Sequence, residues 1–319
     1  RGFRQENVLY DGLRGDPYAG FSVPQLFNIE RVEVLKGPAG ALYGGGDAGG
    51  VINYVTRKPQ AKAQQRAEIQ VGNENFAAGS IEATGPLTSS GAVRYRLGAY
   101  ADGEEGVRWN ADSQSVIGDA SVTFDVGETG ELTVQYTDIT QTLGGNRLRG
   151  VPVDDNGTFL TSRRWNHNEA TDFLDMQAKV VLAQYRFSPS QAWDVDFAAR
   201  WFENSEHQIY HEPMGLIDRD GDGTPEWMTR QLRNQYRDND AYAANGNAVW
   251  RFATGAVEHK LLFGADYYRA EADFRAQTAN SADLPRNAGP VPGVDLFDPV
   301  YGVTSYRDYN LAALPWRDT

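Results

Sequence analysis

The sequence predicts an antiparallel, truncated, all-β transmembrane barrel of about nine strands, preceded by a small mixed α/β domain. Three observations support this fold class. Apolar and polar residues alternate from about residue 64 onward, and the connections between the alternating runs are short and long in turn. The first 60 residues lack this pattern and are rich in glycine turns. We therefore assign residues 1–60 to the small domain and 61–319 to the barrel portion.

Alternation is clearest in VRYRLGAYAD, at residues 93–102. Val93, Tyr95 and Leu97 share one face there, while Arg94 and Arg96 lie on the other. A period of two gives a strand one apolar and one polar face. The same pattern predicts strands at 67–73, 76–85, 120–126, 131–138, 176–187, 193–201, 248–252 and 260–269.

The connections indicate where the apolar faces point. Short ones fall at 86–91, 127–130, 188–191 and 253–258, and long ones at 103–115, 144–172, 206–240 and from 275 to the end. A soluble sandwich or barrel would bury the apolar faces in a core, but such domains rarely carry several long loops. Short turns on one rim and long loops on the other favour a membrane barrel. The aromatic residues near strand ends would suit the interfacial girdles of such a barrel. They are Trp109, Trp193, Trp201, Trp250, Tyr267 and Tyr268.

Composition excludes several classes of protein. The 319 residues include no cysteine, which removes disulfide and thiolate chemistry. The formal net charge of −13 disfavours a binder of the phosphate backbone, so we expect no nucleic acid partner. No run approaches the roughly 20 apolar residues of a membrane helix. The chain opens in mid-domain character with RGFRQENVLYDG, and we expect both ends to be truncated.

A glycine-rich stretch, LYGGGDAGGVIN at 42–53, contains the spacing G-x-G-x-x-G at Gly44, Gly46 and Gly49. In dinucleotide-binding proteins this motif leads into a helix. Here it leads into VINYVT, whose β-branched and aromatic residues favour a strand. The sequence therefore predicts a tight strand–turn–strand connection in which glycine supplies positive φ and close backbone approach.

The first 59 residues resemble a known domain. RGF, YDGLR at 10–14 and NIERVEVLKGPAGALYGGGDAGGVINYVTRKP at 28–59 resemble, in this order, the plug of TonB-dependent outer-membrane receptors, especially the ferric-siderophore branch. HKLLFGADY at 259–267 and VDLFDPVYG at 294–302 resemble segments of ferric-siderophore receptor barrels. The resemblance implies a globular plug inside a barrel of about 22 strands. This chain would hold the later part of the plug and the first part of the barrel.

The resemblance also implies a function. We expect an outer-membrane receptor of a Gram-negative bacterium that binds a ferric siderophore at the cell surface and imports it by TonB-coupled plug movement. Its partners would be the siderophore, the TonB inner-membrane complex and outer-membrane lipid, and it would have no catalytic residues. Import of cobalamin, haem or an oligosaccharide is the alternative within this class. A non-transporting adhesion or structural barrel is the alternative outside it, and a soluble enzyme is the least favoured.

Site residues follow from the same resemblance. Plug loops that point outward supply the ligand-binding candidates Arg4, Gln5, Glu6, Arg14, Asp16 and Tyr18. The long loops add Arg147, Arg149, Trp165, Tyr210 and Trp227, because arginine and aromatic side chains suit anionic, aromatic chelates. Structural roles in the plug fall to Glu30, Arg31, Glu33, Gly37, Pro38, Tyr43, Gly44, Gly49, Gly50 and Asn53. Glu30, Arg31 and Glu33, with Arg57 and Lys58, form a charged set that is expected to pair with polar lumen residues such as Arg94 and Arg96.

Two loop motifs leave alternatives open. DRDGDGTPEWMT at 218–229 places Asp218, Asp220, Asp222 and Glu226 at calcium-loop positions, but Thr229 stands where a bidentate glutamate belongs. It is either a weak Ca²⁺ site or a polar loop tip. EHQIYHE at 206–212 spaces two histidines four residues apart, as in a metal pair or a pH-responsive loop.

Overall fold

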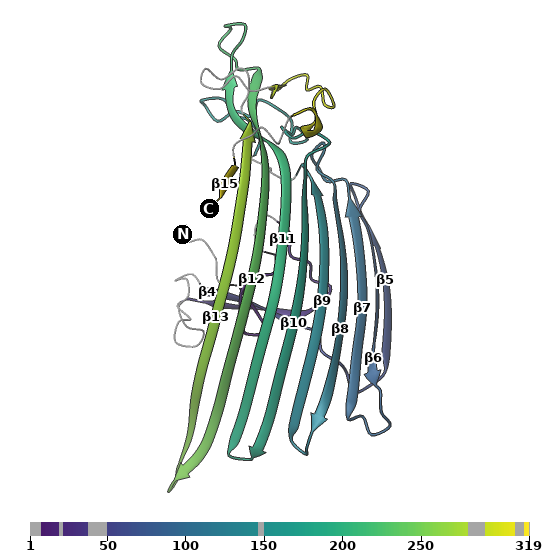
Figure 1. Ribbon diagram of the computed structural model, residues 1–319, viewed down its shortest axis with the longest axis vertical. Helices are drawn as coiled ribbons and strands as arrows, with labels where there is room; N and C mark the ends of the chain where they lie inside the picture. Colours follow the sequence, from purple (N-terminus) through teal and green to yellow (C-terminus); the bar gives the residue numbers. More distant parts are fainter. Residues whose placement is uncertain are drawn as a thin grey trace.

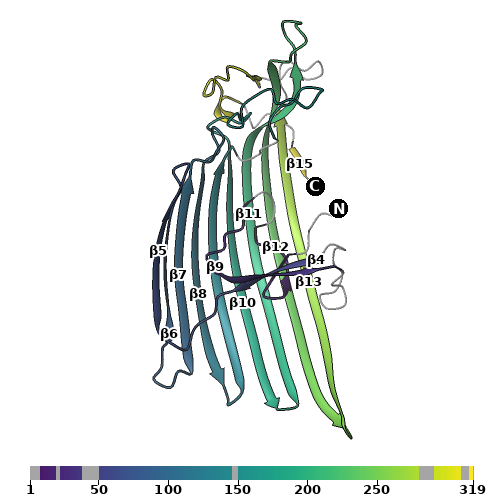
Figure 2. The ribbon, with the colours of Figure 1, turned by 180° about the vertical axis from the view of Figure 1, so that it is seen from behind.

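The computed structural model describes residues 8–18, 22–37, 50–145, 150–279, 291–309 and 316–318. A tall curved wall of antiparallel strands carries a small sheet on its inner side (Figures 1 and 2). The small sheet has the order β2-β1-β4-β3, with β1 parallel to β4. Its strands are β1 (Val8–Tyr10), β2 (Leu13–Arg14), β3 (Ile29–Lys36) and β4 (Gly50–Thr56).

The wall runs in sequence order, and each long strand is antiparallel to the next. Its nine long strands agree with the predicted number. They are β5 (Gln64–Val71), β6 (Ala77–Pro86), β7 (Val93–Glu104), β8 (Ser113–Val126), β9 (Gly130–Gly144), β10 (Phe173–Ser190), β11 (Trp193–Ile217), β12 (Trp227–Thr254) and β13 (Val257–Ala279). The short strands β14 (Val294–Asp295) and β15 (Trp316–Asp318) pair with β12 and β13.

Helical structure in the described ranges is limited to one 3-10 turn, η1 (Tyr306–Asp308). None of the described helices is long and apolar enough to span a membrane.

The strands are longer than the sequence pattern predicted. β11 and β12 pair as far as Ile217 and Trp227, so the loop predicted at 206–240 is wrong and only 218–226 connects these two strands. Above the apolar part of the wall polar residues stand on both strand faces, and alternation fades although backbone pairing continues. The long connection between β9 and β10, at 145–172, agrees with its prediction.

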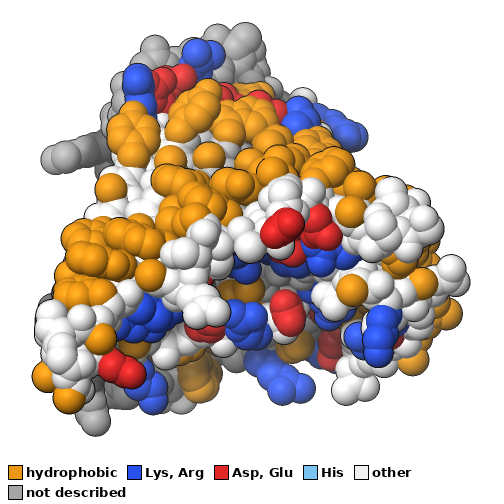
Figure 3. Space-filling model, turned by 90° about the horizontal axis from the view of Figure 1, so that it is seen from below, with side chains coloured by type: hydrophobic (Ala, Val, Ile, Leu, Met, Phe, Trp, Pro, Cys, Tyr) orange, Lys and Arg blue, Asp and Glu red, His pale blue; other side chains and the backbone are white. Residues whose placement is uncertain are grey.

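The outward face of the wall carries an apolar band between aromatic residues. Trp193 and Trp250 stack at 5.5 Å near one rim, and the indole of Trp201 donates to Asp240 on the other side of the band. Eight residues separate Trp193 from Trp201, or about 26 Å of strand at about 3.3 Å per residue. This height matches the roughly 25 Å apolar band of membrane barrels. Figure 3 shows hydrophobic side chains gathered in a band, with many charged side chains gathered beside it.

Short turns lie on one rim of the wall, and the long connections lie on the opposite rim (Figure 1). We call these the short-turn rim and the loop rim. In outer-membrane barrels the short turns are periplasmic and the long loops extracellular.

The small domain packs against the inner face of β8, β9 and β10. Tyr10, Tyr18 and Ile29 join Ile117 and Met176 in one buried cluster. Such packing fixes the small domain at mid-height, between the two rims (Figure 2).

Candidate functional site

One segment of the small domain, Gly12–Pro17, lies directly against β11 and β12, and we call it the wall-bound segment. Asn245 Nδ2 on β12 lies 3.5 Å from the carbonyl oxygen of Gly12. Asn204 Nδ2 on β11 donates to the carbonyl oxygen of Pro17 at 2.8 Å. Both wall side chains therefore donate hydrogen bonds to backbone carbonyls of the segment. These bonds do not depend on which side chains the segment carries.

Arg200 on β11 holds the middle of this segment. Its Nη2 donates to the carbonyl oxygens of Arg14, at 2.7 Å, and Gly15, at 2.5 Å. The guanidinium lies 5.3 Å from the ring centroid of Tyr10 and 5.1 Å from that of Phe202. Arg200 is 4% exposed, and its Nε and Nη1 have no hydrogen-bond partner among the described residues. No carboxylate contacts this guanidinium within hydrogen-bond distance in the described part of the chain.

The approach of segment to wall is closest at Gly15. A Cβ added there would lie 2.7 Å from the ring of Phe202 and 3.0 Å from that of Tyr268, and the φ of +101° also favours glycine. Tyr268 therefore faces the lumen, which corrects its assignment to an interfacial girdle. Trp109, assigned to the same girdle, contacts Tyr301 in the loops instead.

Three predicted ligand residues lie in or beside the wall-bound segment. Arg14 Nε lies 3.8 Å from Asp266 Oδ2 on β13. Asp16 accepts hydrogen bonds from the Tyr10 hydroxyl (3.3 Å) and the Tyr18 amide (2.9 Å), and burial raises the pKa of its carboxyl group. Tyr18 is only 5% exposed within the packed cluster. The structure therefore gives Tyr18 a packing position rather than the outward position that the resemblance implied.

A second contact between small domain and wall is built from charges, and we call it the charged joint. Arg96 on β7, 1% exposed, forms ion pairs with Asp119 on β8 and Glu82 on β6. Arg57, just after β4, lies 3.4 Å from Glu82. Asp119 also accepts a hydrogen bond from Asn28 of the small domain at 3.3 Å. Each buried charge of the joint therefore has an opposite charge beside it.

The charged joint continues along the chain. The Thr56 hydroxyl lies 2.7 Å from Asp11 Oδ2 and 2.9 Å from Gln135 Oε1 on β9. Lys58 Nζ lies 3.4 Å from Asp11 and 3.2 Å from Gln135, and burial lowers the pKa of its amine. The end of β4 and the residues that lead to β5 are thereby fixed to the wall.

The predicted ion pairs of Glu30, Arg31 and Glu33 with the lumen are wrong for the described residues. Glu33 accepts hydrogen bonds from Asn53 Nδ2 and Arg31 Nε, each at 2.8 Å, which hold the pKa of its carboxyl group below the ordinary value. These partners belong to the small sheet itself, because β3 forms its edge away from the described wall and all residues after Ile29 are exposed. Arg94 pairs instead with Asp125 and Glu131 of the wall.

Above the wall-bound segment, three neighbouring strands present an aligned group to the lumen. Glu206 on β11 is opposite Arg237 on β12, which is opposite Phe274 on β13. Arg237 Nη1 lies 3.8 Å from Glu206, and its guanidinium lies 5.6 Å from the Phe274 ring centroid. Glu206 is buried, whereas the Arg237 side chain is 28% exposed. We call these residues the lumen trio. The sequence analysis missed Glu206 and Arg237 because it treated 206–240 as a loop, although Gln235, Arg237 and Asn239 do alternate. Phe274 lies beyond the strand predicted at 260–269.

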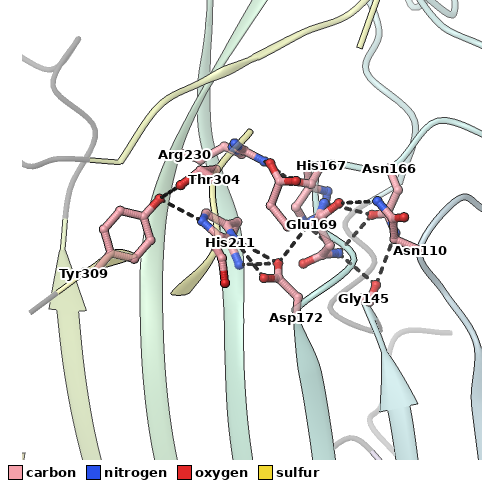
Figure 4. A network of polar contacts seen from close by, with 12 residues as sticks. Asn110, Gly145, Asn166, His167, Glu169, Asp172, His211, Arg230, Thr304 and Tyr309 are labelled. Carbon is pink, nitrogen blue, oxygen red and sulfur yellow. Dashed lines mark hydrogen bonds and ion pairs between the residues drawn. The ribbon is translucent and has the colours of Figure 1, made fainter. Parts of the chain in front are cut away.

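The loops at the loop rim are tied together by buried polar contacts (Figure 4). His211 Nδ1 lies 2.8 Å from Asp172 Oδ1, and His211 Nε2 lies 3.2 Å from the Tyr309 hydroxyl. That hydroxyl is 2.6 Å from Thr304 Oγ1. The contacts link the connection 145–172, strand β11 and the segment 291–309. His211 therefore lies within strand β11. Among the described residues, neither His211 nor His207 belongs to a group of three side chains that could hold a metal ion.

A buried ion pair reinforces the same loops. Arg230 on β12 pairs with Glu169 at 2.8 Å, and both side chains are 1% exposed. Arg230 also donates to the carbonyl oxygen of His167, and Glu169 accepts from the amide of Gly302. We call this braced set of loops the loop cap.

The loop cap has its own apolar core, formed by Trp165, Met228, Val294 and Leu296. Trp165 is 1% exposed, so it packs the cap instead of facing a ligand. Tyr210 is equally buried, and its hydroxyl lies 3.4 Å from Gln235 Oε1. These burials contradict the expectation of ligand-facing side chains. Trp227 is half-buried. The guanidinium of Arg219 lies over its indole ring, 3.5 Å from the ring centroid.

The plug glycines fall partly within the described ranges. A Cβ at Gly50 would lie 2.2 Å from the carbonyl oxygen of Leu35, and its φ is +133°, so the strand pair leaves room only for glycine. Gly37 has a φ of +88° in open space. Asn53 accepts from the Gly12 amide at 3.0 Å. Several predicted residues lie outside the described residues, namely Arg4, Gln5, Glu6, Pro38, Tyr43, Gly44, Gly49, Arg147 and Arg149.

The acidic loop tip has carboxylate oxygens of Asp218, Asp220 and Asp222 within 4.8 Å of one another. Asp218 accepts hydrogen bonds from the amides of Gly221 and Gly223, which lower the pKa of its carboxyl group. Glu226 accepts from the amide of Arg219 at 2.7 Å. Calcium binding at this tip stays a prediction.

Comparisons with known proteins agree with this architecture. The family model of the TonB-dependent receptor plug domain matches residues 1–51. The metal-pseudopaline receptor CntO of Pseudomonas aeruginosa is 26% identical over 285 residues, which cover 88% of this chain and 38% of the relative. The ferrioxamine B receptor of Salmonella typhimurium is 25% identical over 320 residues, covering 95% and 42%. The chain thus spans about two fifths of the length of these curated relatives.

Solved structures show the same fold. The ferripyoverdine receptor of the Pseudomonas aeruginosa outer membrane, bound to ferripyoverdine, superposes with a TM-score of 0.76 at 20% identity, over 99% of this chain and 42% of that receptor. The siderophore receptor PiuA of Acinetobacter baumannii gives 0.75 at 16% identity, over 98% and 45%. The chain is thus similar to TonB-dependent receptors of the outer membrane, over plug residues and over the nine long strands of the described barrel wall.

Proposed function

We propose that the receptor containing this chain binds a ferric siderophore at the cell surface and imports it through TonB-coupled movement of the plug. The observation that carries the proposal is a folded domain held against the inner face of the barrel wall. A domain that fills a lumen suits a protein that must open and close it. The relatives named above as receptors for metal chelates support the ligand class.

The lumen trio is the proposed ligand contact on this part of the wall. Arg237 offers a partly exposed cation beside an aromatic ring, a combination that binds anionic, aromatic chelates. Along β11 and β12 it lies between the loop rim and the wall-bound segment, where a ligand entering from outside would meet the plug. The proposed role involves binding and passage without any bond being made or broken, so no catalytic group is required.

Growth under iron limitation tests the proposal. Cells with and without the gene are supplied with a panel of ferric chelates, including hydroxamates, catecholates and pyoverdine-like peptides. We expect gene-dependent growth on at least one chelate, and loss of that growth when the TonB complex is inactivated. Growth that is indifferent to every chelate, or gene-dependent uptake of cobalamin, haem or an oligosaccharide instead, would contradict it.

We also propose that the acidic tip of the β11–β12 connection binds Ca²⁺ weakly and orders this loop. Three clustered carboxylates, Asp218, Asp220 and Asp222, support it, and extracellular calcium sites of this type bind in the range of about 10⁻⁴–10⁻³ M. Calorimetric titration of the receptor with millimolar Ca²⁺ tests it, with Asp220→Asn as the paired variant. Absence of heat and of any change in protease cleavage would refute it.

A further inference from the structure

Three arginines are buried in the described part of the chain, and they differ in how their charge is balanced. Arg96 and Arg230 each form ion pairs with carboxylates. Arg200 is 4% exposed, yet no carboxylate of the described residues lies within ion-pair distance of its guanidinium. A charge in a protein interior is strongly unfavourable unless it is paired. Arg200 therefore needs a counterion that the described side chains do not supply.

Two carboxyl groups of the small domain are close enough to influence Arg200, but both are engaged elsewhere. Asp11 accepts from the Thr56 hydroxyl at 2.7 Å and forms an ion pair with Lys58 at 3.4 Å. Asp16 accepts two hydrogen bonds within the small domain, and burial raises the pKa of its carboxyl group, which favours the neutral form. Neither group therefore serves as the counterion of Arg200.

A small cavity lies beside Arg200, between the small domain and strands β9, β10 and β11. Its volume is about 30 Å³. A cavity of this size holds about two water molecules or one monatomic anion, and it is too small for sulfate or phosphate. Apolar side chains form part of its wall, namely Ile139, Val180 and Leu182. The size of the cavity therefore limits an ionic occupant to a halide.

The hydrogen-bonding capacity of the lining groups favours an anion over water. Nε and Nη1 of Arg200 and the hydroxyl of Tyr18 have no hydrogen-bond partner among the described residues. Thr137 and Gln135, which also line the cavity, already donate to Asp119 at 2.7 and 2.9 Å. The free nitrogens of arginine are donors only. Water beside them would leave the positive charge unbalanced, whereas an anion accepts from them and neutralises it.

We propose that the cavity beside Arg200 binds a small monovalent anion of the chloride type, which accepts from Nε and Nη1 and neutralises the buried guanidinium. Nη2 remains on the carbonyl oxygens of Arg14 and Gly15, so the bound ion stabilises the wall-bound segment. Six residues of β11, or about 20 Å, separate Arg200 from Glu206 of the lumen trio. The anion site is therefore distinct from the proposed ligand contact.

Bromide identifies such a site, because it replaces chloride and scatters anomalously. Crystals of the complete receptor are grown with bromide as the only halide, and data are recorded at the bromine absorption edge. We expect a bromide peak in the cavity, at hydrogen-bond distance from Arg200. Arg200→Gln should lose this peak, and Arg94→Gln should keep it, because Arg94 pairs with Asp125 and Glu131 instead. Bromide peaks elsewhere on the receptor without one beside Arg200 would overturn the site.

Amide exchange of residues 12–18 tests the ion in solution. The unsubstituted receptor is compared in sodium chloride and in sodium gluconate of equal ionic strength, because gluconate is too large for the cavity. We expect exchange to be at least fivefold slower at about 150 mM chloride, as for a Kd of about 35 mM or tighter. Arg94→Gln should retain this difference, and Arg200→Gln should exchange equally fast in both salts.

The unsubstituted receptor alone can decide the outcome, so the test does not depend on the folding of Arg200→Gln. Equal exchange in chloride and gluconate, even with a bromide peak in the crystal, would indicate an adventitious ion only and would overturn the proposal. Neither measurement depends on import, so failure of the anion site leaves the proposed function untouched.

Discussion

At the charged joint, Arg96 and Asp119 are both buried and pair with each other, and Glu82 and Arg57 extend the network. At β11–β13, the described polar contacts from the wall to the plug are donors to carbonyl oxygens and one long ion pair, beside the apolar packing of Leu13 on Leu182, Ala198 and Ala243. Breaking a buried ion pair leaves an uncompensated charge, whereas a carbonyl released into a polar cavity is hydrated. The difference indicates one fixed side and one movable side of the plug.

The largest effect is expected at the fixed side. Asp119→Ala removes the partner of the buried Arg96 and the acceptor of Asn28, and should lower the free energy of unfolding by about 3–5 kcal/mol. Thermal unfolding of the purified receptor measures it. Asp125→Ala, which breaks an exposed pair with Arg94, is the control and should cost about 0–1 kcal/mol. Similar losses for both variants would remove the distinction between a fixed and a movable side.

A smaller effect is expected at the movable side. Arg200→Ala removes two hydrogen bonds to the wall-bound segment, for a local cost of about 2 kcal/mol. The barrel should insert normally, while amide exchange in residues 12–18 accelerates and cells become more sensitive to vancomycin. Arg200→Lys should recover part of the protection. Unchanged exchange in Arg200→Ala would show that this contact does not hold the segment.

Strain introduced at Gly15, in the same wall-bound segment, should have a smaller effect still. Gly15→Ala forces a Cβ towards the ring of Phe202 at a positive φ, which costs about 1–2 kcal/mol. We expect faster amide exchange confined to the wall-bound segment. Gly37→Ala is the control, since Gly37 also has a positive φ but stands in open space. If both variants behave alike, backbone conformation rather than contact with the wall determines the cost.

The smallest effect concerns pH. Burial raises the pKa of the Asp16 carboxyl group above its ordinary value of 3.8. Its contribution to stability is therefore complete below that value and is lost as pH rises through the raised pKa. In the unsubstituted receptor, protection of residues 12–18, corrected for intrinsic exchange rates, should fall as the pH rises above about 4 and through the raised pKa of Asp16. Asp16→Asn should abolish this dependence, and an identical pH profile would contradict the assignment.

Much of the fold could be predicted from local pattern. Alternation within the lipid-facing band predicted the wall strands, because lipid on one side and a polar lumen on the other impose a period of two on segments such as 193–201. Above the band this constraint ends, so the upper parts of β11 and β12 were taken for a loop. Glu206 and Arg237 of the lumen trio lie there and were missed for that reason.

The site was less accessible to sequence reasoning. Trp165 and Tyr210 belong to residue types that bind aromatic chelates, but they pack the loop cap, and only long-range contacts reveal this. Glu33 and Arg31 pair within the small sheet, because sequence pattern does not show which face of β3 meets the wall. Arg200 carried no motif, and its role depends on a strand 185 residues away from Gly15.

Every residue type has a backbone carbonyl, so the way in which Asn204, Arg200 and Asn245 hold the plug leaves most side chains of residues 12–17 unspecified. Position 16 can therefore change between related receptors, or in an engineered one, without a matching change in the wall. Leu13 and Gly15 are exceptions, because Leu13 packs on Leu182, Ala198 and Ala243, and the neighbours of Gly15 occupy the space of a side chain. Arg14 is tied to the wall more loosely, through its long ion pair with Asp266.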